Sequence, residues 1–309
     1  MGRIFNAAKI FVTVIFLCGI IFIGGKASAA DVDAMEIFRE TVIQTSKFDD
    51  RAFHQDIFFI VPRFTGELDF LGATEKDSLK LAGQLEFWAV DDSGNDTHTE
   101  YPFYLVQDSK NMVLYFKNEK KWQKLTSPVA AKNFVDMVAT PNVKDLDKMI
   151  SFVKDITVLQ ESEKSRTLLV RLDGNKIVDE IKAEMAKDPE VQKQVTDETA
   201  NAVFDCVESG FRTADFWYTW TVNKNTWQTD TMSFNFSNLV QNISTAVLND
   251  PSLGVASVEP IREFLQTLAF YSEFKAYTTF LNPEAKAKLE IPKKVLKAKE
   301  VESFAENKK

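Results

Sequence analysis

The strongest constraint on the fold is a period of two in the side chains between Ser78 and Val90. Successive side chains of a β-strand point to opposite faces of a sheet, so this alternation predicts a strand with one apolar and one mostly polar face. The apolar positions are Leu79, Leu81, Leu85, Phe87 and Ala89. Their face of the sheet must be covered by other parts of the chain or by a ligand.

Further strand-like segments are separated by short polar turns. Residues 108–110 separate strands expected at 101–107 and 111–117, and residues 118–120 lead into a strand at 121–125. Turns this short cannot make a parallel crossover, so the pattern predicts an antiparallel meander. Other strands are expected at 53–61, 156–160, 167–172, 215–222, 227–237, 274–281 and 288–291.

Apolar residues at helical spacing interrupt these strands. The spacing predicts a helix over 34–47, two short helices over 128–153, a mostly helical stretch over 175–211 with a break near Pro189, and a helix over 259–268. A sheet interrupted by helices at two or three points fits an α+β domain better than a repeated βαβ fold.

Residues 1–29 have the pattern of a secretory signal peptide. Arg3 and Lys9 precede an uncharged apolar run over residues 10–23, and Ala27-Ser28-Ala29 supplies the small residues that a signal peptidase recognises. An uncleaved membrane anchor is the alternative, but the run of about 14 residues is shorter than the roughly 20 needed to span a bilayer. We therefore expect an extracytoplasmic protein, periplasmic or secreted.

A lipid anchor on Cys18 is not expected, because the large residue Leu17 precedes the cysteine where lipidation requires a small one. The predicted organisation is a signal peptide over 1–29, one domain over 30–299 and a disordered polar tail over 300–309. No stretch after residue 30 is long and apolar enough for a membrane span, so we expect a soluble protein without a transmembrane segment.

Charge and cysteine content restrict the partners and the chemistry. The net charge is −8, and removal of the three basic residues of 1–29 makes it −11, which argues against binding to nucleic acid or to anionic lipid surfaces. Only Cys206 then remains, so no intramolecular disulfide can form. Because Cys206 lies among apolar residues at helical spacing, we interpret it as a buried structural thiol.

The groups that catalysis usually requires are scarce. The two histidines are too few for a histidine-based metal site: His54 begins an expected strand, and His98 is expected in a solvated turn. No nucleophile elbow, phosphate-binding loop or zinc-protease motif is present. The sequence predicts a protein that is not an enzyme and that has no catalytic residues, metal or cofactor.

Three motifs resemble the LolA/LppX-like family of exported bacterial proteins. They are the meander that ends in Lys121-Trp122-Gln123-Lys124-Leu125, the hairpin turn Trp220-Thr221-Val222-Asn223-Lys224-Asn225-Thr226, and the ending Lys288-Leu289-Glu290-Ile291-Pro292-Lys293-Lys294-Val295, which is similar to an uncharacterised lipoprotein branch. The resemblance implies a curved antiparallel half-barrel with helices packed on its concave face. The family's lipidation cysteine is missing here.

One apolar face of the predicted sheet is the candidate site. On one interpretation these residues form only the core of the domain; on the other, a half-barrel capped by helices keeps a cavity for an acyl chain. The candidate lining residues are Leu79, Leu81, Leu85, Phe87, Phe103, Leu105, Leu114, Phe116, Met137, Met149, Phe216, Tyr218 and Trp220.

Together with export, this face predicts a non-enzymatic binder or carrier of a hydrophobic ligand, either a lipid or an acyl chain, with a possible protein partner in the cell envelope. The alternative is an extracytoplasmic sensor or protein-interaction domain without a cavity. It would use exposed aromatics such as Trp88, Trp217 and Trp227, which alternation places opposite the apolar face.

The first testable prediction concerns processing. We expect the intact mass of the protein from its native host to correspond to a chain that begins at Ala30 or Asp31, without lipid on Cys18. A mass that retains residues 1–29 or includes a diacylglyceryl group would contradict the signal-peptide assignment.

Overall fold

The computed structural model describes residues 32–45, 51–61, 64–75, 78–90, 95–107, 111–118, 121–128, 150–185, 198–281 and 289–301. The strands are β1 Arg51–Val61, β2 Phe64–Glu75, β3 Ser78–Val90, β4 Asp96–Gln107, β5 Asn111–Asn118, β6 Lys121–Pro128, β7 Val153–Glu161, β8 Ser165–Leu172, β9 Phe216–Asn223, β10 Thr229–Asn235, β11 Glu273–Leu281 and β12 Lys299–Glu300. The α-helices are α2 Val32–Thr45, α5 Gly174–Met185, α7 Glu198–Thr213, α8 Ser237–Asn249, α9 Glu259–Tyr271 and α10 Lys293–Leu296.

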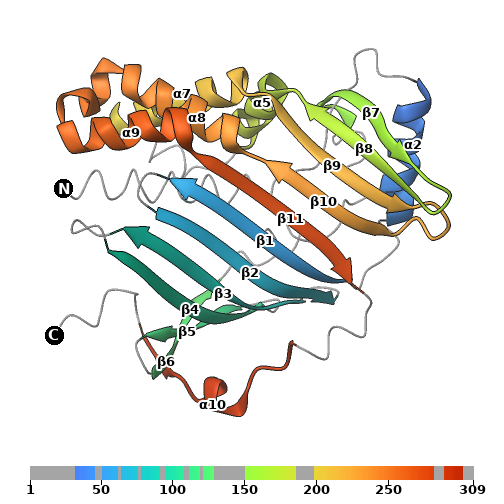
Figure 1. Ribbon diagram of the computed structural model, residues 1–309, viewed down its shortest axis with the longest axis horizontal. Coiled ribbons are helices and arrows are strands. Elements are labelled where there is room, and N and C mark those ends of the chain that lie inside the picture. The colour runs from blue at the N-terminus through green and yellow to red at the C-terminus, as the bar shows by residue number, and fades with distance from the viewer. Residues whose placement is uncertain are drawn as a thin grey trace.

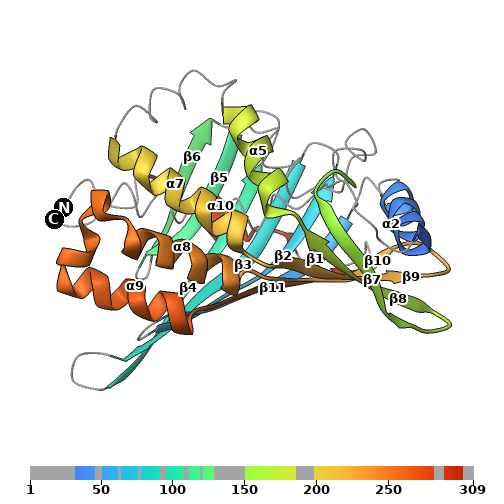
Figure 2. The same cartoon turned by 90° about the horizontal axis from the view of Figure 1, so that it is seen from above.

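These strands form one curved sheet in the order β12-β6-β5-β4-β3-β2-β1-β11-β10-β9-β8-β7. Neighbours pair antiparallel except β12 and β6, which pair parallel. The sheet does not close, and Figure 1 shows its curvature. Helices α5, α7, α8 and α9 lie together at one end of the strands and α2 at the other (Figure 2). The chain is therefore an α+β half-barrel with helices on its concave face, as the sequence predicts.

The strand register gathers the apolar residues on the concave face. Residues that lie directly opposite one another in antiparallel strands share a face of the sheet. One such row crosses six strands from β1 to β6 and consists of Phe53, Gly72, Leu81, Leu105, Leu114 and Leu125. The period of two in each strand therefore becomes a continuous apolar surface.

Two glycines of β2 make room for aromatic rings of β1. Gly72 lies opposite Phe53 and Gly66 lies opposite Phe59. A Cβ atom at Gly72 would lie 2.1 Å from the ring of Phe53, and one at Gly66 would lie 2.0 Å from the ring of Phe59. The phenylalanine rings therefore lie across the backbone of β2, where any larger residue would displace them.

The larger core cluster lies under β7 to β11. Phe38 and Val42 of α2 are 1% and 0% exposed, and the ring of Phe38 packs edge-on against Trp220 of β9 with centroids 5.7 Å apart. At the other end of β9, Phe211 of α7 packs against Phe216 with centroids 5.2 Å apart. The helices at the two ends thus cover the same face of β9.

Most of the expected strands are confirmed, and the prediction for Ser78–Val90 matches β3 at both ends. Strand β2 was not predicted, because Gly66 and Gly72 interrupt its apolar alternation. Helix α8 was also missed, since its many Asn, Ser and Thr residues have weak helix propensity.

Two expectations near the C-terminal end of the chain are contradicted by the structure. The prediction of a strand at 288–291 is wrong, because the described residues 289–292 contain no strand and α10 begins directly after Pro292. Glu300 does not belong to a disordered tail, because it lies in β12 and its carboxylate contacts Lys124 Nζ at 2.9 Å. The signal peptide, most of the helices expected over 128–153, and residues 302–309 lie outside the described residues.

Replacing Phe38 with alanine tests how far α2 stabilises the half-barrel. We expect Phe38→Ala to lower the free energy of unfolding by about 3–5 kcal/mol, because it removes a fully buried ring and leaves a cavity beside Trp220. Denaturant unfolding measures the change, with Glu36→Ala on the exposed side of α2 as the matched control. Equal stability of the two variants would contradict this role of α2.

Cys206 of α7 is buried as predicted, with 4% of its surface exposed. Burial, and then the nearby Asp250 carboxylate, raises the pKa of the Cys206 thiol to about 11, compared with about 8.5 in an unfolded chain. We expect iodoacetamide at pH 8 to alkylate the native protein more than about 100-fold more slowly than the protein unfolded in urea, because the thiolate is the reactive form. Similar rates in the two states would show that Cys206 is accessible.

Candidate functional site: an apolar concave face and an acidic convex band

The concave face has two parts that differ in burial. In the part covered by α2 and α7, Phe216, Tyr218 and Trp220 are 2%, 5% and 3% exposed and belong to the larger core cluster. The indole N–H of Trp220 donates a hydrogen bond to Thr229 Oγ1 at 2.9 Å, so its polar group is satisfied inside the core. These three predicted site residues are therefore packed as core.

The second part of the concave face is only half-buried and rich in aromatic rings. We call it the aromatic face and define it by Phe59, Phe64, Phe87, Tyr101 and Phe274. These rings contact one another across five adjacent strands, from β11 through β1, β2 and β3 to β4, with centroids 5.9–6.3 Å apart. Tyr101, at the β4 side, is 45% exposed.

The remaining predicted site residues lie on this same side of the sheet. Leu79 and Leu81 are buried in a smaller core cluster with Phe53 and Phe70, and Phe103 and Leu105 pack against that cluster. The half-buried members are Leu85, Phe87, Phe103, Leu105, Leu114 and Phe116. Met137 and Met149 lie outside the described residues.

Sequence reasoning missed four members of the aromatic face: Phe59, Phe64, Tyr101 and Phe274. Phe59 alternates with Ile57 along β1, so its side of the strand could have been inferred. Its contact with Phe274 could not, because β1 and β11 are more than 200 residues apart in the chain and pair only in the folded sheet.

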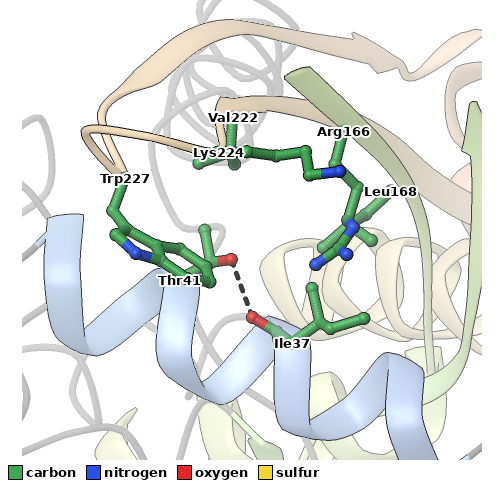
Figure 3. Close-up of a pocket in the computed structure, with 7 residues that line it drawn as sticks. All are labelled: Ile37, Thr41, Arg166, Leu168, Val222, Lys224 and Trp227. Carbon is green, nitrogen blue, oxygen red and sulfur yellow. Dashed lines mark hydrogen bonds between the residues drawn. The ribbon is translucent and has the colours of Figure 1, made fainter. Parts of the chain in front are cut away.

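A small pocket lies where α2 meets β8 and β9 (Figure 3). It is lined by Ile37, Thr41, Arg166, Leu168, Val222, Lys224 and Trp227. It offers about 10 Å³ to a water-sized molecule, which is room for about one water and far too little for an acyl chain.

The two cations of this pocket are paired. Glu161 Oε1 lies 2.9 Å from Arg166 Nη2 and 2.7 Å from Lys224 Nζ. Hydrogen bonds from Arg166 and then Lys224 lower the pKa of the Glu161 carboxyl to about 2. Glu161 neutralises one of the two positive charges and contacts both cations, which weakens the attraction of the pocket for an anionic ligand.

The convex face carries an acidic band across β1 to β4. It consists of His54, Asp56, Glu67, Asp69, Glu86, His98 and Glu100. Three carboxylate pairs lie directly opposite one another in the register: Asp56 with Asp69, Glu67 with Glu86, and Glu86 with Glu100. Burial, followed by the neighbouring Asp69, raises the pKa of the Asp56 carboxyl above its usual value.

Each histidine of the band contacts two carboxylates. His54 Nε2 lies 2.7 Å from Asp69 Oδ2 and 3.5 Å from Asp56 Oδ1. His98 Nε2 lies 2.8 Å from Glu86 Oε2, while its Nδ1 lies 4.0 Å from Glu100 Oε1. The expectation that His98 occupies a turn is wrong, because pairing with β3 extends β4 back to Asp96.

The three tryptophans expected on the polar side do not gather into one surface. Trp88 lies on β3 and is 38% exposed, whereas Trp217 lies on β9, with β2, β1, β11 and β10 between those strands. Trp227 packs against the larger core cluster and lines the pocket beside α2.

These observations define the class of protein as an open α+β half-barrel with an apolar inner face. The chain belongs to a family of unknown function, DUF6612, whose sequence model matches residues 88–247. The match runs from the end of β3 to α8. The search of curated proteins returned no match to this chain. Within the described residues, no helix is long and apolar enough to cross a membrane.

Proposed function

We propose that the protein is a non-enzymatic binder or carrier of a hydrophobic ligand, a lipid or an acyl chain, in the cell envelope. The observation that carries this proposal is the aromatic face, where rings that touch across five strands remain half-buried. Contiguous apolar surface that the chain leaves partly uncovered is what a hydrophobic ligand requires.

The character of the concave face favours binding over catalysis. The inward positions between Phe53 and Gln107 on β1 to β4 carry no charged residue; their polar members are glutamine, threonine and tyrosine. Metal chemistry, or acid–base chemistry by a carboxylate or an imidazole, on a ligand held there would need such groups on this face. The histidines lie on the opposite, convex face.

Two features from the sequence support the cell envelope as the location. The signal peptide expected over 1–29 would export the chain to a place beside membranes, where a carrier of lipid has a role. The resemblance to the LolA/LppX-like family implies the same half-barrel in exported proteins, and we propose a relationship to that family on this basis.

The binding free energy at such a site would be similar for many hydrophobic ligands and would not select one compound. Each Å² of apolar surface removed from water contributes about 25 cal/mol before the costs of ordering ligand and side chains. The uncharged inner positions offer no ion pair to a head group. We therefore propose that affinity follows the length of the apolar chain more than the head group.

A sensor or protein-interaction domain is the second candidate, and one observation favours it. Helix α9 presents Phe264, Phe270 and Tyr271 with 42%, 75% and 74% of their surfaces exposed. Exposed aromatic residues are enriched in protein interfaces. None of these three residues belongs to the aromatic face, so the two candidates can be tested with different variants.

Phe87→Glu tests the proposed function. We expect the purified wild-type protein to take up a fluorescent fatty acid, and Phe87→Glu to bind it at least about tenfold more weakly, because a charge replaces a ring at the centre of the aromatic face. The matched control is Trp88→Glu, which makes a similar change one residue away on the convex face and should leave uptake unchanged. Circular dichroism and melting temperature confirm that both variants fold.

Organic extraction of freshly purified protein, followed by mass spectrometry, provides an independent measurement. Absence of co-purified lipid together with no fatty-acid uptake by the wild-type protein would overturn the binder and favour the interaction domain. Phe264→Glu should leave uptake unchanged if the aromatic face is the binding surface.

A further inference from the structure

We propose that His54, Asp56 and Asp69 on the convex face form a binding site for one divalent transition-metal ion of the zinc class. The site is independent of the proposed hydrophobic-ligand site, because it lies on the other face of the same strands. Both histidines of the chain fall in the acidic band, although 44 residues separate them in the sequence.

Backbone pairing places the three side chains together. Asp56 of β1 lies directly opposite Asp69 of β2, and His54 is two residues before Asp56 on the same face of β1. Both carboxylates approach the same ring nitrogen, since His54 Nε2 lies 2.7 Å from Asp69 Oδ2 and 3.5 Å from Asp56 Oδ1. The three potential ligand atoms all lie within 4.8 Å of one another.

These distances are close to those of a metal site. Nitrogen and oxygen atoms about 2.0–2.2 Å from a tetrahedral zinc ion lie about 3.3 Å from each other. The separation of 3.5 Å between His54 and Asp56 already matches, and the Asp69 carboxylate would need to withdraw from the ring nitrogen by only about 0.6 Å. All three side chains are partly exposed, at 33%, 33% and 49%, so an ion can enter and keep a water ligand.

The local charge favours a cation. Like charges directly opposite one another in a sheet are unfavourable, and the pair Asp56 and Asp69 is flanked by Glu67. Residues 54–58, 67–71, 82–88 and 98–104 contain no lysine or arginine. On β11, Tyr277 lies opposite Asp56, and the nearby Lys275 is already ion-paired with Glu273 at 2.6 Å.

The ligand set indicates the class of metal. One imidazole nitrogen and two carboxylate oxygens suit zinc and its neighbours in the transition series, whereas Mg²⁺ and Ca²⁺ favour oxygen ligands alone. Bound metal would join β1 to β2 through side chains and so stabilise the folded state by mass action.

The second histidine of the band provides a matched control: His98, Glu86 and Glu100 have a similar composition, and their potential ligand atoms also lie within 4.8 Å of one another. Glu86 contacts Nε2 of His98 and Glu100 contacts Nδ1, so the two carboxylates reach different nitrogens of the ring. The ring is also stacked on Trp88, with centroids 5.0 Å apart and 8° between the planes. This cluster does not converge on one ring nitrogen as the first does.

The test is zinc titration of the full chain after removal of metal with a chelator. We expect isothermal titration calorimetry to show one zinc site, the melting temperature to rise with zinc, and Mg²⁺ to bind at least about tenfold more weakly. His54→Gln and the isosteric Asp69→Asn should each weaken zinc binding at least about tenfold, while His98→Gln should leave it unchanged. Circular dichroism confirms that each variant is folded.

Three results would overturn the site. The first is no heat and no change in melting temperature at about tenfold excess of zinc. The second is unchanged binding in folded His54→Gln and Asp69→Asn, or equal loss in His98→Gln. The third is Mg²⁺ binding as tight as that of zinc. Fatty-acid uptake by His54→Gln should match the wild type, which keeps this test separate from that of the proposed function.

Discussion

The strand register from β6 to β10 is the constraint on which the rest of the structure depends. Pairing continues without a shift through β5, β4, β3, β2, β1 and β11, so the apolar rows of successive strands meet on the concave face. A slip of one residue would turn the apolar set to the convex face and bring the carboxylates of the acidic band inside. The cost of burying those charges fixes the register.

The concave face formed by this register has one part whose side chains are fully buried and another whose side chains are only half-buried. Under α2, Phe38 and Val42 complete a core in which Trp220 is 3% exposed. Towards β4 the rings cover one another and the glycines of β2, but they stay half-buried. The first part therefore contains the larger core cluster, whereas the rings of the second part stay partly exposed beside the smaller one.

On the convex face, antiparallel pairing brings like charges together, with Asp56 opposite Asp69 and Glu86 opposite both Glu67 and Glu100. Such pairs oppose folding unless a proton, a histidine or a cation balances them. Both histidines lie in this band, and Nε2 of His54 contacts the carboxylates of both Asp56 and Asp69. The arrangement follows from the sheet, since these residues are not clustered in the sequence.

The α+β class, most strands and the side of the sheet that the residues of those strands face could be predicted from the sequence, because alternation is a local property of a strand. Strand β2 was not predicted, because Gly66 and Gly72 are typical of turns. In the structure the rings of Phe59 and Phe53 cover these glycines. The burial of Trp220 in the core and the half-buried state of Phe87 could not be predicted, since they depend on where α2 packs in the folded protein. The contact between His54 and Asp69 was missed together with β2, since it depends on the pairing of β1 with β2. The contact between Phe59 and Phe274 could be seen only in the folded sheet, because pairing between distant strands is set by the whole sheet and by no local pattern.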